Sequence, residues 1–368
     1  SGISNNLDQS EVIYVDDDNI SGPWDGSEQY PFQEIQGALD VANDGDTVFV
    51  FSGSYVGNII IEKSVHLSGQ DKHDTIIKNG KHNIWIYADG VSVSNFSIVN
   101  SSRYFSGVYI VSSDNVIEDN LIFDNYDGVL MDNTDNNIIR NNVIFDNWDR
   151  NIRVEFSEDI EISSNYVGKS NYGIYLWSSS NNVIFNNVVD HCDWGISIGD
   201  SSNGNLIFRN TLFRNGNSNG FDEIGNNNWD NGAEQGGNYW SDYIGSDEDG
   251  DGFGDVSYVV SDEALDRFPL MRPPNVDKPG IIMKNGFGFT VEVSNQNDLA
   301  LNGLLQVSIT NFQGKIREEF DHSIILLNPD EQYEISKQIF GFGVYTVNLE
   351  FGIWTWEQDA IGFGPFWI

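Results

Sequence analysis

The sequence has few basic residues, a single cysteine and no long apolar run. Lysine and arginine together number 18 against 56 aspartate and glutamate residues, so the formal net charge is −38. A field of this sign repels nucleic acid and anionic lipid, and we expect neither as a partner. Cys192 is the only cysteine, which excludes intrachain disulfides. No apolar segment approaches the roughly 20 residues of a membrane-spanning helix, so we expect no direct membrane insertion.

The composition is nevertheless that of a folded, exported protein. Hydrophobic residues make up 39% of the chain and aromatic residues 13%, which argues against disorder. The chain starts at Ser1 rather than at methionine, as expected of a trimmed, secreted form that acts outside the cell or at its surface. Three sequons, at Asn19, Asn95 and Asn100, permit glycosylation.

A repeat of about 22 residues runs through the middle of the chain. Short β-type segments begin at Gly107, Gly128, Asn151, Gly173 and Gly195. A second marker keeps the same interval, at Asn120, Asn142, Asn165, Asn187 and Asn210. Two residues after each marker asparagine stands an apolar residue, and four residues before it stand Val116, Ile138, Glu161, Val183 and Leu206. We assign both columns to the core, with Ile160 and Ile162 serving the slot that Glu161 occupies.

A period of this length predicts an all-β, right-handed parallel β-helix of seven to nine coils. Each coil has three short strands, and each strand pairs with its copy about 4.8 Å away. The asparagines stand at a bend, where they tolerate the left-handed conformation and bond to their copies in a ladder. Phe32, Ile35, Leu39 and Ala42 share one helical face, so a helix over residues 31–43 is expected to cap the open core.

The chain divides into four segments. Residues 1–10 are expected to be a flexible N-terminus and residues 11–240 the capped β-helix. Residues 241–277 hold an acidic loop and a linker. Residues 278–368 alternate apolar and polar residues, as at 289–293, 305–309 and 345–349, and predict an immunoglobulin-like β-sandwich.

Several motifs resemble those of NosD-like β-helix proteins. They are Gly53-Ser-Tyr55, the segments 58–69 and 75–77, Gly237-Asn-Tyr-Trp-Ser-Asp242 and Phe268-Pro-Leu-Met271. The resemblance covers residues 11–272 and implies a PbH1-repeat fold common in archaeal surface proteins. It implies no single activity, because the group includes a periplasmic protein of copper-site maturation and distant polysaccharide-active enzymes. The glycine-aromatic motifs of the C-terminal part are similar to those of an immunoglobulin-like module of archaeal secreted proteins.

The acidic loop is a candidate calcium site. Asp247, Asp249, Asp251 and Asp255 place oxygen ligands at alternate residues, and Gly250 and Gly252 allow the tight turns between them. The glutamate of a complete EF-hand loop is absent, since position 258 is Tyr. Calcium is the only cofactor we expect, in a structural role; the alternative is a solvated acidic turn.

An aromatic and charged face is the second candidate site. Residues expected to point outward from the first strand of each coil, or to lie at the bend before it, are Trp85, Tyr87, Tyr109, Asp132, Trp148, Arg153, Glu155, Tyr175, Trp177 and Trp194. Exposed rings stack on sugar rings while the charged groups donate and accept hydrogen bonds. The alternative is packing against one another or against another subunit.

These features favour a structural or adhesive cell-surface protein, self-assembling as a fibre, sheath or surface layer and stabilised by calcium. Its expected partners are further copies or other surface proteins, with polysaccharides as the alternative. The first alternative is a polysaccharide-binding protein or a lyase, epimerase or hydrolase, for which Asp132 with Glu155 would supply the carboxylates and Arg150 with Arg153 the cations. The second is metal-site maturation, although copper prefers clustered Cys, Met or His ligands and these are scattered here.

Overall fold

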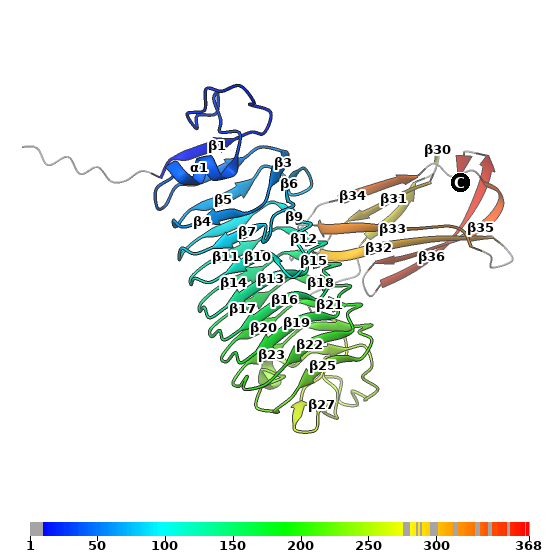
Figure 1. The fold of residues 1–368 in the computed structure, drawn as a ribbon. Helices are drawn as coiled ribbons and strands as arrows, with labels where there is room; N and C mark the ends of the chain where they lie inside the picture. The colour runs from blue at the N-terminus through cyan, green and yellow to red at the C-terminus, as the bar shows by residue number, and fades with distance from the viewer. Residues whose placement is uncertain are drawn as a thin grey trace, which may run out of the picture. The chain divides into compact units, whose positions relative to one another are not determined.

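A computed structural model describes residues 10–274 and most of the strands beyond them (Figure 1). The chain forms two compact units, Ser1–Pro274 and Asn275–Ile368. Nine of the ten residues expected to form a flexible N-terminus lie outside the described residues. In the second unit the described residues are 280–284, 286–287, 289–294, 301–311, 316–327, 332–337, 341–351, 354–364 and 366–367.

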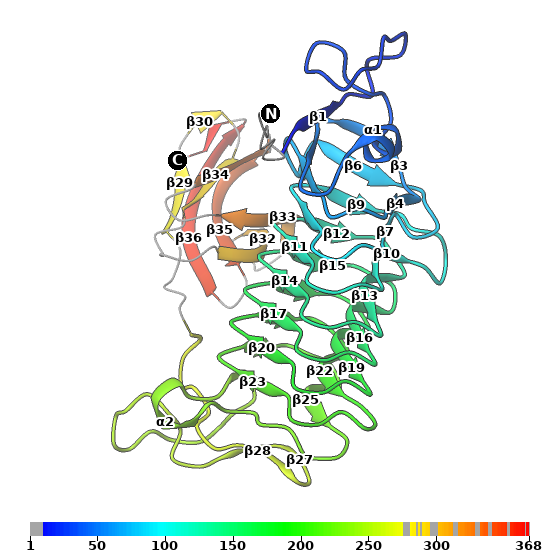
Figure 2. The same ribbon diagram turned by 90° about the vertical axis from the view of Figure 1, so that its left-hand side faces the viewer.

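The first unit is a parallel β-helix, as the repeat predicts (Figures 1 and 2). Its three parallel sheets have nine, eight and nine strands. Sheet 1 holds β1 (Val12–Val15), β2 (Thr47–Val50), β5 (His66–Gly69), β8 (Ser92–Ser94), β11 (Val116–Glu118), β14 (Ile138–Arg140), β17 (Glu161–Ser163), β20 (Val183–Phe185) and β23 (Leu206–Phe208).

The other two sheets complete each coil. Sheet 2 holds β4 (Ile59–Ile61), β7 (Ile84–Ile86), β10 (Ser106–Ile110), β13 (Asp127–Asp132), β16 (Arg150–Glu155), β19 (Tyr172–Trp177), β22 (Trp194–Ile198) and β25 (Ser218–Asp222). Sheet 3 holds β3 (Gly53–Val56), β6 (Thr75–Lys78), β9 (Ser97–Val99), β12 (Leu121–Phe123), β15 (Val143–Phe145), β18 (Tyr166–Gly168), β21 (Val188–Asp190), β24 (Thr211–Phe213) and β26 (Tyr239–Trp240).

Apolar side chains of equivalent strands stack into columns inside the coil. The column expected two residues after each marker asparagine is confirmed, and all its members are fully buried: Ile122, Ile144, Val167, Val189 and Leu212. The column assigned to sheet 1 is wrong by one residue. Glu161 pairs with Ile138 and Val183 on the outer surface, and the core column is Ile117, Ile139, Ile162, Ile184 and Ile207. A shift of one residue moves a side chain to the other face of a strand. Because the outer residue and the core residue next to it are both apolar in most coils, the apolar pattern does not show which of the two points inward.

The five marker asparagines lie in one buried ladder. Each Nδ2 donates to the Oδ1 of the next asparagine at 3.0–3.2 Å, and Asn210 continues the ladder to Asn238 at 2.9 Å. The left-handed conformation belongs to the residue before each asparagine: Asp119, Asn141, Ser164, Asn186 and Arg209. The expectation that the asparagine itself adopts it is therefore wrong. The left-handed residue turns the chain, and the asparagine amide bonds to the carbonyl groups that the bend leaves unpaired, as Asn142 does to Ile117 and Arg140.

A helix caps the N-terminal end of the core, but it is shorter than the apolar spacing predicts. Helix α1 spans Ile35–Val41 and buries Ile35, Ala38 and Leu39. Phe32 is outside it, because its backbone pairs with β1: its N–H donates to Tyr14 and its carbonyl accepts from Asp16, both at 2.8 Å. The apolar spacing continues through this extended segment, so spacing alone does not place the start of the helix.

The C-terminal end of the core is also covered. Trp229 and Trp240 are buried, and the hairpin of β27 (Tyr258–Ser261) and β28 (Ala264–Asp266) packs near β25 (Figure 2). A short helix, α2 (Gly232–Gln235), precedes β26 in the chain. The buried Asp266 carboxylate accepts from the N–H groups of Asn238, the Trp240 indole and Phe268 at 2.7–3.0 Å. This carboxylate ties the last asparagine of the ladder to the segment that follows the hairpin.

The second unit is antiparallel. A three-stranded sheet holds β29 (Gly280–Lys284), β31 (Phe289–Ser294) and β34 (Gln332–Lys337). A six-stranded sheet holds β30 (Gly286–Phe287), β32 (Leu301–Asn311), β33 (Ile316–Leu327), β35 (Gly341–Phe351), β36 (Trp354–Gly364) and β37 (Phe366–Trp367). The three segments expected as strands lie in β31, β32 and β35. Two antiparallel sheets fit a sandwich, and the immunoglobulin type stays a prediction.

Candidate functional site

The outer surface of sheet 2 carries the aromatic and charged residues that the repeat predicts. Its central column is Ile60, Trp85, Tyr109, Leu130, Arg153, Tyr175, Ser197 and Phe221, each paired with the next in register. A second column brings Asp132, Glu155 and Trp177 together. From Trp85 to Tyr175 the column crosses four coil steps, or about 19 Å at the usual strand spacing. We call this surface the sheet 2 face.

Two groups of rings lie at opposite ends of the sheet 2 face. In the first, Trp85 and Tyr109 are 5.4 Å apart between centroids and both contact the buried His82 ring, at 4.3 and 4.6 Å. In the second, Tyr175 lies 5.2 Å from Tyr172 and 6.3 Å from Trp177. The rings therefore pack on one another, as the alternative reading expects, but Tyr87 and Trp177 keep 47% and 36% of their surface exposed.

The rings at the bends do not form one column. Tyr172 and Trp194 begin strands; Tyr172 pairs in register with Arg150, and Trp194 pairs with Tyr172 in the next coil. Tyr126 and Trp148 lie outside the strands in a separate row with Tyr104, with neighbouring centroids 5.1 Å apart. Trp148 is 62% exposed and Tyr104 is 60% exposed, so this row is the more accessible one.

An ion cluster separates the two ring groups. The guanidinium of Arg153 binds Glu155 at 2.6 Å and the buried Asp127 at 3.1 Å. Arg150 binds Asp149 at 2.5 Å and lies over the Tyr175 ring, 4.9 Å from its centroid. The residue-by-residue reading of the sequence missed Asp127, although alignment of the repeats sets it directly against Arg150 in the next coil.

Burial shifts the ionisation of two groups on this face. It raises the pKa of Asp127, although Arg153 and Arg150 oppose that rise. It also raises the pKa of Tyr109 to about 12, and the neighbouring Asp132, which accepts the Tyr109 hydroxyl at 3.1 Å, adds to the effect. Arg153 binds both Asp127 and Glu155, so these two side chains are hydrogen-bonding groups of fixed position. The arrangement favours holding a ligand over transferring a proton.

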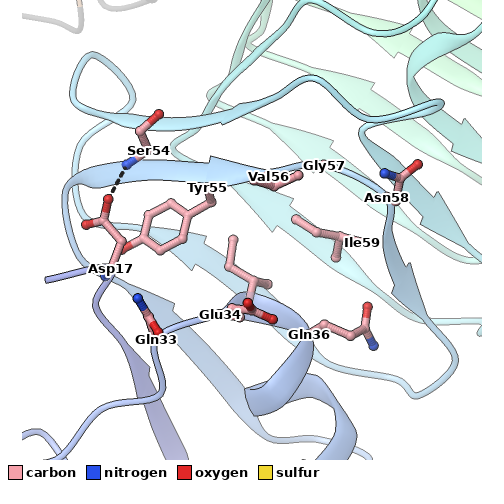
Figure 3. Close-up of a pocket in the computed structure, with 11 residues that line it drawn as sticks. Asp17, Gln33, Glu34, Gln36, Ser54, Tyr55, Val56, Gly57, Asn58 and Ile59 are labelled. Carbon is pink, nitrogen blue, oxygen red and sulfur yellow. Dashed lines mark hydrogen bonds between the residues drawn. The ribbon is translucent and has the colours of Figure 1, made fainter. Parts of the chain in front are cut away.

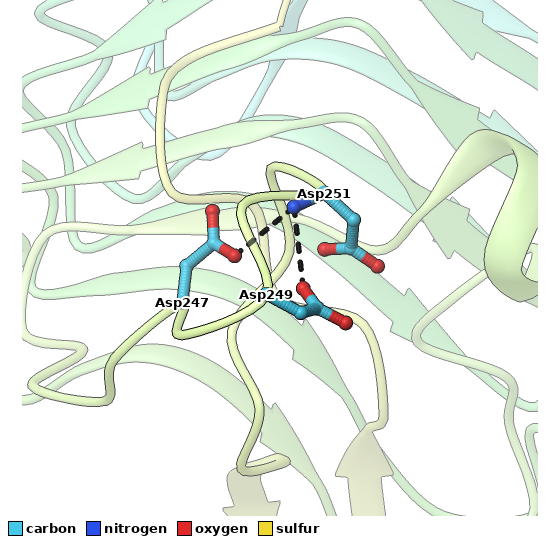
Figure 4. A group of neighbouring side chains, drawn as sticks. All are labelled: Asp247, Asp249 and Asp251. Carbon is cyan, nitrogen blue, oxygen red and sulfur yellow. Dashed lines mark hydrogen bonds between the residues drawn. The ribbon is translucent and has the colours of Figure 1, made fainter.

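The acidic loop brings three of its four aspartates together (Figure 4). One carboxylate oxygen from each of Asp247, Asp249 and Asp251 lies within 4.8 Å of the others, which suits a hard cation. The fourth, Asp255, instead accepts the N–H of Glu248 at 2.8 Å. Asp247 already accepts the N–H groups of Gly250, Asp251 and Gly252, so the loop is ordered by its own turns.

Soft metal ligands are not gathered in the described part of the chain, where the three aspartates form the only cluster of candidate donors. Cys192 is buried beneath Ser170, and burial raises the pKa of its thiol to about 12. It substitutes for a ladder asparagine, since its N–H donates to Asn215 Oδ1 at 2.9 Å. His82 is enclosed by rings, and Met131 lies in the core. These donors do not fit a copper site.

The sequons differ in their surroundings. The Asn19 amide donates to the carbonyl groups of Pro23 and Pro31. Asn95 and Asn100 both adopt the left-handed conformation at bends of the β-helix, and of the three sequon asparagines only Asn100 is exposed. Among the three, Asn100 is the most accessible to glycosylation.

Several solved structures are similar to the chain at low identity, with TM-scores below 0.5. Pectate lyase Pel9A is 15% identical over 59% of this chain and 68% of its own, with a TM-score of 0.47. XylC in complex with xylose is 11% identical over 88% and 99%, with a TM-score of 0.49. Pectin methylesterase PemA from Erwinia chrysanthemi is 12% identical over 57% and 79%, with a TM-score of 0.34. At these levels the likeness says nothing of activity, and no curated protein matches the chain significantly.

One family matches the β-helix itself. The family model described as "Periplasmic copper-binding protein (NosD)" aligns with residues 39–245, more than half of the chain. Within the described residues no helix is long and apolar enough to cross a membrane. The family match confirms the resemblance drawn from the β-helix motifs: the chain belongs to the NosD family.

Proposed function

We propose that the protein is an exported, adhesive cell-surface protein that holds a polysaccharide along the sheet 2 face. The observation that carries the proposal is the order of groups on this face: rings, then a fixed ion cluster, then rings. A glycan lying along the β-helix axis would stack on the rings and bond to Asp132, Arg153 and Glu155 between them. The shortage of basic side chains, with both arginines of the face already paired, favours a neutral glycan.

The NosD family description names copper. Copper chemistry requires several soft ligands in one place, whereas the candidate cluster of the described residues contains only carboxylates. We propose that Asp247, Asp249 and Asp251 hold calcium, which would fix the loop that follows the last coil. An exported location accords with the word "periplasmic" in the family description. The archaeal character of the chain stays a prediction.

Self-association remains part of the proposal, but not by stacking of coils end to end. Helix α1 covers one end of the core and the β27–β28 hairpin covers the other. A second copy would therefore meet a capped end at either side. We propose that copies associate through their flanks.

Affinity electrophoresis in gels that contain neutral or uronate polysaccharides tests the proposed function. We expect a neutral polysaccharide to retard the wild-type chain, and Trp177→Ala combined with Glu155→Ala to weaken binding about ten-fold or more, because a ring and an acceptor are lost. Trp24→Ala is the matched control, since Trp24 is 49% exposed but lies in the N-terminal loop. Equal retardation of the double variant and the wild type would show that the sheet 2 face is structural.

A further inference from the structure

In the N-terminal coil, β4 and β3 lie at the edges of sheets 2 and 3, so their outward main-chain groups face no further strand. A side chain of the protein pairs with these groups at β4. Strand β4 is the edge of sheet 2, so the main-chain groups of Ile60 point away from β7. The Gln36 side chain, from helix α1, binds both: Ile60 N–H donates to Gln36 Oε1 at 2.9 Å, and Gln36 Nε2 donates to the Ile60 carbonyl at 3.2 Å. One amide thus replaces a neighbouring strand at β4.

Strand β3 is the edge of sheet 3, and its outward main-chain groups are paired at one residue only. The N–H groups of Gly53 and Gly57 donate to the carbonyl groups of Asp74, just before β6, and of Lys78, the last residue of β6. By alternation, the N–H groups of Ser54 and Val56 point the other way. Ser54 N–H donates to Asp17 Oδ2 at 2.9 Å (Figure 3). Val56 is 72% exposed, and no described group pairs with its outward N–H and carbonyl.

A cavity of about 420 Å³ lies over this open edge (Figure 3). Helix α1 and the segment before it form one wall, and β3 and the start of β4 form the other. The charged residues of its lining are Asp17 and Glu34, and no basic residue lines it. Polar amides of Gln33 and Asn58 complete the rim.

We propose that this cavity binds an extended peptide segment with a basic side chain, which adds a strand to β3. The free N–H and carbonyl of Val56 would pair with the main chain of the peptide, as in other cases of strand addition. Asp17 and Glu34 would receive the basic side chain. A second copy of this chain is a poor occupant of this site, because the acidic lining favours a basic segment and the chain has only 18 basic residues against 56 acidic ones. The site is independent of the sheet 2 face and of any glycan.

The test uses the full chain and two blocked peptides, Thr-Val-Lys-Val-Thr-Val-Thr and the same sequence with Glu in place of Lys. Binding is followed by fluorescence anisotropy, and protection of the Val56 amide by hydrogen exchange. The decisive pair of variants is Val56→Pro, which removes the outward N–H without breaking a bond to β6, and Val56→Thr, which keeps it and nearly keeps the shape. Melting temperatures confirm that both variants are folded.

We expect the lysine peptide to bind, to protect Val56 and to retain its affinity in Val56→Thr. Val56→Pro should weaken it about ten-fold or more, and Glu34→Gln should weaken the lysine peptide without weakening the glutamate peptide. Lack of saturable binding at millimolar peptide, equal binding by Val56→Pro and Val56→Thr, or a preference for the glutamate peptide would each overturn the proposal. A dimer that Val56→Pro abolishes, without peptide binding, would also overturn it.

Discussion

Substitution of Asn165 by alanine tests whether the asparagine ladder holds the coils together. Asn165 is 1% exposed and lies in the middle of the ladder. Its Oδ1 accepts both the main-chain N–H and the Nδ2 of Asn142, at 2.9 and 3.1 Å. Its Nδ2 donates to the carbonyl groups of Ile139 and Ser163 and to Asn187 Oδ1, at 2.8–3.0 Å.

The expected loss of stability follows from the partners left behind. Without the amide, at least the Asn142 N–H and the Ile139 carbonyl lose a buried partner, at roughly 1–3 kcal/mol each. We therefore expect Asn165→Ala to lower the free energy of unfolding by about 3–4 kcal/mol. Asn165→Asp should cost at least as much at neutral pH, because a carboxylate oxygen would face the Ile139 and Ser163 carbonyl groups.

Equilibrium unfolding in urea measures the effect, followed by tryptophan fluorescence and by far-UV circular dichroism. If the two signals change together, the coils unfold as one cooperative unit, which a repeat fold does not guarantee. Asn203→Ala is the matched control: its side chain is exposed, and we expect a change within about 0.5 kcal/mol. If Asn165→Ala behaves like Asn203→Ala, the ladder does not stabilise the fold and our reasoning is refuted.

Three further outcomes are expected. Gly128→Ala should lower the melting temperature clearly, since a Cβ there would lie 2.5 Å from the Asn151 carbonyl oxygen; a melting temperature equal to that of the wild type would contradict this packing. Burial lowers the pKa of His82 from 6.5 to about 4, so between these pH values the unfolded chain binds a proton that the folded chain does not, and His82 destabilises the fold as the pH falls. The stability difference between the wild type and His82→Gln should therefore shrink as the pH falls from about 6.5 towards 4. A constant difference in melting temperature over this range would exclude the effect. Calcium should raise the melting temperature of the wild type more than that of Asp249→Asn, with Ile244→Ala, 98% exposed nearby, as control; an equal rise in all three would place calcium elsewhere.

The coil and its ladder are visible in the sequence because they repeat. Asn120, Asn142 and their equivalents recur at the period of the coil, and each meets the same surroundings in the structure. The face of a three-residue strand is harder to predict. Val116 and Ile117 are both apolar, and only their pairing shows that Ile117 points inward.

Contacts that occur only once along the chain are hard to predict from a repeating pattern. His82 precedes the clear coils, and nothing in its sequence neighbourhood predicts that it would contact Trp85 and Tyr109. The Asp127 and Arg153 pair is 26 residues apart and depends on the exact register of β13 against β16. The closing of the β4 edge by Gln36 likewise depends on where helix α1 begins, which the apolar spacing did not fix.

Main-chain pairing and the asparagine ladder repeat from coil to coil, so the number of coils can change without altering either of them. Helix α1 packs on the first strands and the β27–β28 hairpin on β25, so a duplicated or deleted unit of about 22 residues in the middle would keep its main-chain and ladder partners. Such an event would lengthen or shorten the protein by about 4.8 Å without redesign of either end. In this way related chains could differ in the length of the β-helix and keep the same architecture.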